Sequence, residues 1–182
     1  MLEGEKVILR PVEDDDLETL YEFDSDLEVH ALADDEPWAP KSREDWEEEF
    51  RSMLKKTDEN AIFAIEADGA LIGSCSLENF DYTARICELG IVIGDRDFWG
   101  KGFGRDAVGL LLEYAFDELN MNKVYLTVRS DNERAIRSYE ACGFEREGLL
   151  RQHMWTDGDY RDLVAMGVLR RDRAKEGAGG NQ

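Results

Sequence analysis

The chain has 182 residues, a length typical of one domain, and hydrophobic residues make up 42% of it, enough to fill a single core. No apolar run approaches the roughly 18–20 residues that a membrane span needs, and the N-terminus lacks the features of a signal peptide, so we expect a cytoplasmic protein without membrane partners. The net charge of −20 argues against nucleic-acid partners and suits a cationic amine, although an acidic surface also serves solubility.

The first predicted element is a short strand at Val7–Arg10, which Pro11 ends. The acidic run Glu13–Asp16 suits the start of a helix, because carboxylates are stabilised at the positive end of the helix dipole. A loop follows at Pro37–Pro40, and Ser42–Asp45 then matches a capping box that opens a second helix. The apolar stripe of this helix consists of Trp46, Phe50, Met53 and Leu54.

Three strand-like segments come next. Ala61–Ala67 and Ala70–Phe80 are joined by the tight turn Asp68-Gly69, and Ile86–Ile93 follows as a strongly apolar strand. Together they predict an antiparallel meander.

A helix with one apolar face is predicted over Arg105–Leu119, followed by a strand of alternating residues at Lys123–Arg129. A second capping box, Ser130–Glu133, opens a helix that we expect to end at Gly143. The last two strands are Phe144–Thr156 and Tyr160–Leu169.

This order of elements predicts an α+β domain built on a mixed, mostly antiparallel sheet with flanking helices. We assign residues 1–170 to one domain and expect residues 171–182, which are charged and then Gly-rich, to be a disordered tail. The three cysteines, Cys75, Cys87 and Cys142, are an odd number without CxxC spacing. With only two isolated histidines, they predict buried reduced thiols, no disulfide framework and no metal site.

A glycine-rich turn, Gly100–Gly104, lies between a buried strand and an amphipathic helix. Glycines there let the backbone approach an anion, and the helix N-terminus supplies free amides, while Lys101 and Arg105 add positive charge. By itself such a turn can also be purely geometric. The loop is not a P-loop, because no Lys-Ser or Lys-Thr follows these glycines. It is not a dinucleotide-binding motif either, because its spacing is GxGxG and it follows an antiparallel meander.

At this point the sequence resembles the GNAT superfamily of acyl-CoA N-acyltransferases, over most of residues 9–169. Trp99–Gly104 matches the glycines of the family's phosphate loop, with Trp99 in a slot that is usually Gln or Arg, as in the branch resembling ribosomal-protein-alanine and spermidine acetyltransferases. Asn132 and Tyr139–Phe144 match the family's N-x-x-A-x-x-x-Y-x-x-x-G-F helix. The resemblance implies a GNAT-like fold whose sheet is splayed at the cofactor site.

The resemblance also implies acetyl-CoA as a co-substrate and a set of residues that bind it. Backbone groups of the strand before the loop would hydrogen-bond the pantetheine arm and polarise the thioester, namely those of Ile91, Val92 and Ile93. The loop amides would bind pyrophosphate, and the loop consists of Trp99, Gly100, Lys101, Gly102, Phe103, Gly104 and Arg105. Asn132 would contact the pantetheine or hold the neighbouring strand ends.

Acyl transfer to an amine needs a neutral nucleophile, a stabilised oxyanion and a protonated leaving thiolate. We assign Tyr139 as the general acid. Glu88 is the first candidate for the general base and Glu78 the second, although either carboxylate could instead bind the charge of the substrate, and a water chain could remove the proton. We expect the acceptor site to be lined by Glu78, Phe80, Tyr82, Trp155 and Trp38.

The function that these features favour is transfer of an acetyl group to a primary amine, such as a protein N-terminus, a polyamine or another small amine. One alternative is a transferase for a longer acyl group such as succinyl. Another is an acyl-CoA-binding sensor without turnover. A homodimer is an expectation at the level of the family, and no residue identifies the acceptor.

Overall fold

The computed structural model describes residues 1–33, 38–156 and 158–173. Its strands are β1 Leu2–Glu3, β2 Ile8–Arg10, β3 Asn60–Ala67, β4 Ala70–Asp81, β5 Ile86–Ile93, β6 Lys123–Arg129, β7 Glu145–Thr156 and β8 Asp159–Leu169. Its helices are α1 Leu17–Ser25, α2 Leu27–Ala33, α3 Arg43–Leu54, α4 Phe103–Glu113 and α5 Glu133–Glu140.

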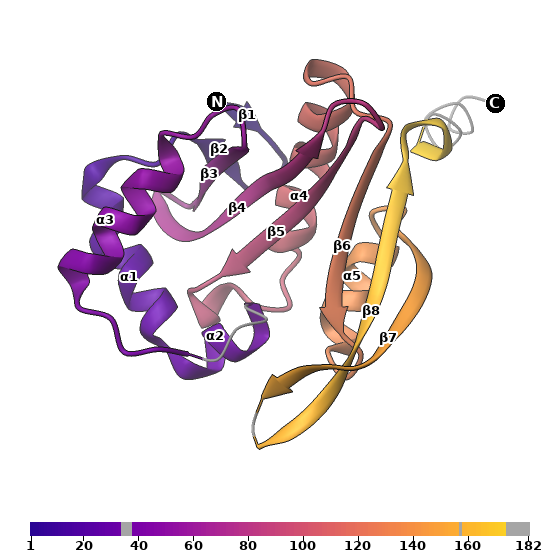
Figure 1. Ribbon diagram of the computed structural model, residues 1–182. Helices are drawn as coiled ribbons and strands as arrows, with labels where there is room; N and C mark the ends of the chain where they lie inside the picture. The colour runs from indigo at the N-terminus through magenta and orange to yellow at the C-terminus, as the bar shows by residue number, and fades with distance from the viewer. Residues whose placement is uncertain (34–37, 157, 174–182) are drawn as a thin grey trace.

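The eight described strands form one sheet in the order β1-β2-β3-β4-β5-β6-β8-β7. Among them only β5 and β6 pair in parallel, which confirms the predicted mixed, mostly antiparallel sheet. Helices α1, α2 and α3 lie on one face of the sheet, and α4 and α5 lie on the other (Figure 1). No described helix has the length and hydropathy of a membrane span.

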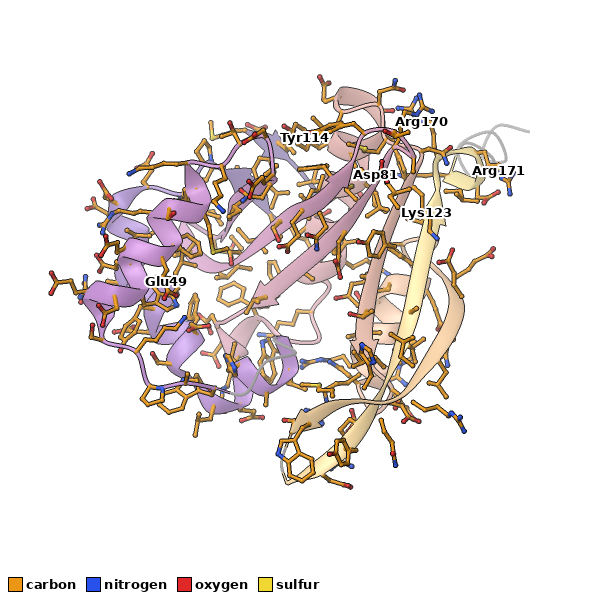
Figure 2. The ribbon with its side chains drawn as sticks, viewed as in Figure 1. Glu49, Asp81, Tyr114, Lys123, Arg170 and Arg171 are labelled. Carbon is orange, nitrogen blue, oxygen red and sulfur yellow. The ribbon has the colours of Figure 1, made fainter. Side chains whose placement is uncertain are left out.

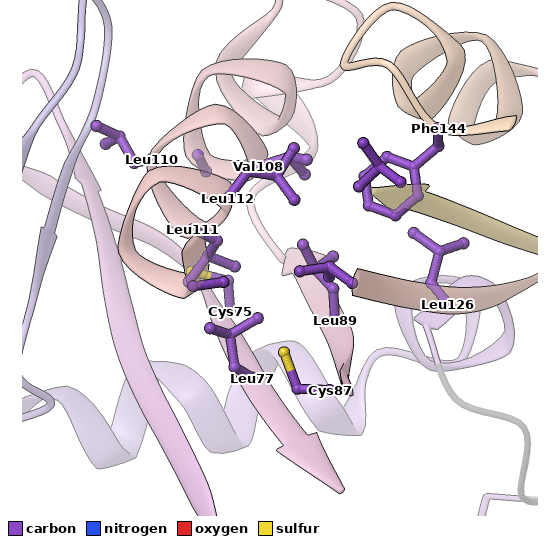
Figure 3. Close-up of a cluster of buried hydrophobic side chains, with 14 of the residues drawn as sticks. Cys75, Leu77, Cys87, Leu89, Val108, Leu110, Leu111, Leu112, Leu126 and Phe144 are labelled. Atoms are coloured by element: carbon purple, nitrogen blue, oxygen red, sulfur yellow. The ribbon is translucent and has the colours of Figure 1, made fainter. Parts of the chain in front are cut away.

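The main core lies between α4 and the strands β4 and β5. Leu111 and Leu112 of α4 are fully buried and face apolar side chains such as Leu77 and Leu89 (Figure 3). Burying a leucine side chain contributes about 1.5–3 kcal/mol to stability. This packing therefore holds α4 firmly against β5, and it fixes the loop that joins them.

The sheet divides between β5 and β6. These two strands pair over three residue pairs only, Ile86 with Lys123, Cys87 with Val124 and Glu88 with Tyr125. Beyond Glu88 they separate, so that the sheet forms a fork whose closed end lies near Asp81 and Lys123 (Figures 1 and 2). We call the diverging end the open end of the fork.

The register of β5 decides which backbone groups face the open side of the fork. The Gly94 N–H donates to the Ile72 carbonyl at 2.9 Å, and hydrogen-bonded pairs alternate along an antiparallel ladder. Val92, the partner of Ser74, therefore turns its amide and carbonyl toward β4. Ile91 and Ile93 turn theirs toward the fork, where β6 no longer pairs with them.

Several predicted boundaries hold and others need correction. β5 and β6 have their predicted bounds, and the Ser42 side chain caps α3 by accepting the Asp45 N–H at 3.1 Å. The second capping box is wrong, because the Ser130 N–H bonds to a carbonyl of β8 and Asn132 caps α5 instead. β1 and α2 were not predicted, and α4 begins at Phe103 and continues as a π-helical turn to residue 118.

The predicted tail and the cysteines have different outcomes. Residues 170–173 form a helical turn, and Arg173 pairs with Glu113 of α4 at 3.1 Å, so the first part of the expected tail is ordered. Residues 174–182 lie outside the described residues. All three thiols are free, and burial raises the pKa of Cys87 to about 12 and that of Cys142 to about 11.

Candidate active site

Two cavities meet at the open end of the fork. The first, of about 560 Å³, lies against α4 and α5, and the second, of about 810 Å³, lies beneath α1, α2 and α3. Seven residues line both cavities, and none of them is charged: Val29, Leu32, Ile91, Val92, Asn132, Ala135 and Tyr139. A molecule in the first cavity can therefore reach one in the second through an uncharged passage.

The loop between β5 and α4 forms an anion cradle on the first cavity. Gly100 and Gly102 have φ values of +71° and +89°, in the left-handed region that glycine favours. Gly102 is the N-cap of α4 and no side chain caps the helix, which leaves the first amides of α4 without a helical partner. Free amides at a helix N-terminus bind phosphate groups, so the loop fits the pyrophosphate of an acyl-CoA.

Positive charge gathers on the first cavity in a chain of net charge −20. The cationic side chains that line it are Lys6, Lys101, Arg105, Arg134 and Arg137. All eleven residues expected to bind the cofactor also line this cavity, namely residues 91–93, residues 99–105 and Asn132. Lys6 and the two arginines of α5 were not among the predicted cofactor-binding residues.

Lys6 reaches the loop from the other end of the chain. The Asp106 carboxylate of α4 accepts the backbone N–H groups of Glu5, Lys6 and Val7 at 3.3, 2.7 and 3.0 Å. This places the Lys6 ammonium 5.5 Å from the centre of the Phe103 ring. Nothing near Lys6 in the sequence signals this contact, because it depends on a carboxylate 100 residues away.

Trp99 stands in the slot where the family pattern has Gln or Arg. Its indole N–H donates to the Ile93 carbonyl at 2.7 Å. Its ring lies under the Arg134 guanidinium, whose carbon is 4.3 Å from the ring centre. The departure from the pattern therefore keeps a hydrogen-bond donor in the slot and adds an aromatic face.

Asn132 and Tyr139 face the passage between the two cavities. The Asn132 side chain accepts the Ala135 N–H at 3.1 Å, so its amide oxygen caps α5. The Tyr139 ring packs against Phe144 with 5.7 Å between ring centres, and no described residue hydrogen-bonds its hydroxyl. Burial raises the pKa of Tyr139 to about 12, with Cys142 adding to it, so the hydroxyl is a donor at neutral pH.

Two carboxylates lie side by side on the second cavity. Glu78 and Glu88 are direct partners across β4 and β5. Glu78 accepts the Ser76 hydroxyl at 3.0 Å, and Glu88 accepts the side-chain amide of Asn79 at 2.8 Å. No cation in the described part of the chain forms an ion pair with either carboxylate, whereas Glu49 of α3 (Figure 2), on the same cavity, pairs with Lys41.

The residues expected to bind the acceptor do not all come together. Trp38 and Glu78 line the second cavity. Phe80 instead packs against the core and stacks on Tyr82, which is 61% exposed. Trp155 lies on the exposed β7–β8 hairpin against Tyr160, so these three aromatic residues are outside the lining of the cavity.

The apolar stripe of α3 forms part of the wall of the second cavity, although its residues were not among those predicted to bind the acceptor. Trp46 and Phe50 stack with 4.9 Å between ring centres and line the second cavity, and no residue of α3 is fully buried. The stripe therefore faces a cavity. Its helical spacing was the available signal, but spacing does not tell a core from a cavity wall.

Comparison with known proteins agrees with this geometry. The family described as an acetyltransferase (GNAT) domain matches residues 6–145. The spermidine N(1)-acetyltransferase of Vibrio cholerae is 30% identical over 90% of this chain and 93% of its own length. A putative ribosomal N-acetyltransferase of Bacillus subtilis is 34% identical over 70% of this chain and 67% of its own. The crystal structure of a spermidine N-acetyltransferase from Vibrio cholerae with CoA and spermine has a TM-score of 0.85 and 29% identity, and it covers 94% of this chain and 99% of that one.

Proposed function

The chain belongs to the GNAT acetyltransferase family and is an N-acetyltransferase, and we propose that it transfers acetyl from acetyl-CoA to a primary amino group of a polyamine. The observation that carries the choice of acceptor is the pair Glu78 and Glu88 on the second cavity. Relatives named spermidine N-acetyltransferases, one of them solved with CoA and spermine, support it.

The carboxylate pair lowers the stability of the protein when no substrate is bound. Like charges directly opposite each other in an antiparallel pair are destabilising, on the scale of about 0.2–1 kcal/mol. An ammonium group between Glu78 and Glu88 offsets this repulsion. The rings of Trp46 and Phe50, which line the same cavity, suit the methylene groups that separate the charges of a polyamine. A monoamine would use the carboxylates but not the aromatic wall.

The chemistry is assigned to groups around the passage between the cavities. Acetyl-CoA supplies the acetyl group as a thioester. Ile91 directs its N–H toward the open side of the fork, where it can donate to the carbonyl oxygen and stabilise the charge that develops there. Glu88 accepts a proton from the substrate ammonium, directly or through water, so that the neutral amine can attack the thioester carbon. Tyr139, protonated at neutral pH, donates a proton to the leaving thiolate.

The passage also bears on the acyl group. None of the seven residues shared by the two cavities is charged. The second cavity beyond them carries two carboxylates that form no ion pair with any described cation. A succinyl group would bring a third negative charge toward Glu78 and Glu88. This favours acetyl over succinyl as the transferred group.

The test is release of free CoA thiol from acetyl-CoA with spermine, spermidine, a monoamine and an alanine-terminated peptide. We expect the two polyamines to give the highest kcat/KM. Glu78→Gln and Glu88→Gln should raise KM for spermidine about tenfold or more, since each removes a charge-assisted contact, and leave KM for acetyl-CoA unchanged. Glu48→Gln, an equal charge change on the exposed side of α3, is the matched control and should change neither constant.

Two results would contradict the proposal. If CoA binds tightly and no amine accelerates thiol release, the protein is a sensor and not an enzyme acting on these amines. If the peptide is the best acceptor and the two Gln variants treat spermidine as the unaltered protein does, the polyamine assignment is wrong although the transferase remains.

A further inference from the structure

Trp99 closes a gap in the backbone hydrogen bonding of β5. The carbonyl of Ile93 faces the open side of the fork, where β6 offers no partner. The Trp99 indole N–H donates to it at 2.7 Å. The side chain thus substitutes for the missing strand at this one position, and it ties the end of β5 to the cofactor loop.

Two guanidinium groups lie near the same indole ring. Arg96 lies 5.9 Å from the ring centre and is held by Asp26 at 2.6 Å, with Glu28 as a further partner. Arg134 of α5 lies closer, at 4.3 Å. The Trp99 ring therefore lies near a guanidinium held by Asp26 and Glu28 and closer to one that belongs to α5.

Arg134 differs from Arg137 of the same helix in its partners. Arg137, one turn further along α5, is ion-paired with Glu133 at 3.0 Å. Arg134 has no hydrogen bond or ion pair to any described residue, and the Trp99 ring is its closest described ionic or aromatic contact. In a chain with 42 carboxylate side chains, a guanidinium that lines a cavity and retains all its N–H donors is suited to an anionic ligand.

We infer that Trp99 is a positioning residue for the cofactor, which holds Arg134 over the first cavity so that its guanidinium binds a phosphate group of CoA. The planar guanidinium stacks on the ring and keeps its edge, with the N–H donors, free for the phosphate. The inference rests on the proposed use of the first cavity by the cofactor. It assigns the ring of Trp99 and its N–H to separate tasks.

The two tasks can be separated by substitution. Trp99→Phe keeps a ring under Arg134 and loses the N–H. Trp99→Gln restores the amide donor of the family pattern and removes the ring. If the ring positions Arg134, Trp99→Gln should weaken CoA binding about tenfold, and Trp99→Phe by no more than about twofold, because only the first frees Arg134 to leave the cavity.

The decisive measurement is the Kd of CoA by titration calorimetry, which needs no turnover, in a double-mutant cycle. Arg134→Met should weaken binding about tenfold, the loss of one charge-assisted contact. The double variant of Trp99→Gln and Arg134→Met should be no weaker than Arg134→Met by more than about twofold, since both remove the same contact. Arg137→Met, on the same cavity but off the ring, is the matched control, and its effect should multiply with that of Trp99→Gln. Steady-state kinetics should show the Arg134→Met loss in KM for acetyl-CoA with kcat unchanged.

Any one of three outcomes would overturn the inference. The first is that the effects of Trp99→Gln and Arg134→Met on the Kd of CoA multiply as independent losses. The second is that Trp99→Phe binds CoA as weakly as Trp99→Gln, and the third is that Arg134→Met binds CoA as tightly as the unaltered protein. In each case a loss of CoA binding by Gly102→Val would show that the cofactor site itself stands. If Gly102→Val also binds CoA normally, the proposed cofactor site fails as well. Thermal unfolding of every variant identifies any that does not fold. If Trp99→Gln does not fold, the Kd values of CoA for Trp99→Phe and Arg134→Met are compared instead.

Discussion

Replacement of Gly102 tests the anion cradle most directly. Gly102 caps α4 with a φ of +89°, and the amides that follow it are the proposed pyrophosphate donors. Alanine at this position is driven out of the left-handed region, which tilts those amides away from the cavity. We therefore expect Gly102→Ala to weaken CoA binding strongly and Gly102→Val, with a branched Cβ, to abolish it.

The stability cost and the binding cost can be calculated separately. A non-glycine residue in the left-handed region costs roughly 1–2 kcal/mol. The nearest atom to an added Cβ is the Lys6 Cε at 3.6 Å, an ordinary contact, so no steric clash adds to this strain. At about 2–4 °C per kcal/mol, Tm should fall by roughly 2–8 °C. Loss of one charge-assisted hydrogen bond, about 1.5–3 kcal/mol, raises the Kd of CoA by roughly 10- to 150-fold.

The matched control is Gly69→Ala in the turn between β3 and β4. Gly69 has a φ of +77°, and an added Cβ would meet no atom within 4 Å. It should therefore lose as much Tm as Gly102→Ala while binding CoA normally. Differential scanning calorimetry and isothermal titration measure the two quantities. If Gly102→Ala binds CoA as the unaltered protein does, or if Gly69→Ala loses affinity to the same extent, the cradle lies elsewhere.

Three further predictions follow from burial and charge. Tyr139→Phe should lower kcat about 100-fold, near the small end of general acid effects because a phenol of pKa about 12 is a weak acid, and leave the Kd of CoA unchanged; an equal change in both would remove Tyr139 from the acid role. Because burial raises the pKa of Tyr139, the hydroxyl stays protonated at high pH, so the pH profile of kcat should show no basic limb from Tyr139 below about pH 11. Asp16→Asn should lower the free energy of unfolding by about 3 kcal/mol at neutral pH, since it breaks the bidentate pair with Arg10 at 2.7 and 2.9 Å. The pair holds the pKa of Asp16 below its usual value, so the difference in unfolding free energy between the two proteins, measured in urea, should shrink as the pH falls through that pKa. A difference that stays constant with pH would contradict the assignment.

The residues proposed to bind the cofactor could be selected from the sequence because their chemistry is local. A glycine loop followed by a helix supplies its own amides. Short sequence motifs are therefore enough to identify Gly100, Gly102 and Asn132 as candidates. Lys6 and Arg134 could not be found in this way. Lys6 depends on the Asp106 carboxylate, and Arg134 on the ring of Trp99, both contacts between distant segments.

The acceptor half was harder because it depends on a break in periodicity. Strict alternation along β4 puts Phe80 on the same face as Glu78. The structure has a register shift between Glu78 and Asp81, where Asn79 adopts a φ of +52°. The extra residue reverses the alternation, so Phe80 turns to the core while Asn79 turns to Glu88. This irregularity explains why Phe80 does not line the cavity as predicted.

The short ladder between β5 and β6 has a consequence for how the protein responds to its surroundings. With three residue pairs, this is a seam along which the two halves of the sheet can part without either half unfolding. A ligand seated in the open end would bridge the seam and act as a removable strand. The amides of Ile91 and Ile93 should then exchange with solvent deuterium quickly in the free protein and slowly when CoA is present. At a CoA concentration 100 times its Kd the protein would gain about 2.7 kcal/mol, so the supply of its own co-substrate would set how long each copy survives proteolysis.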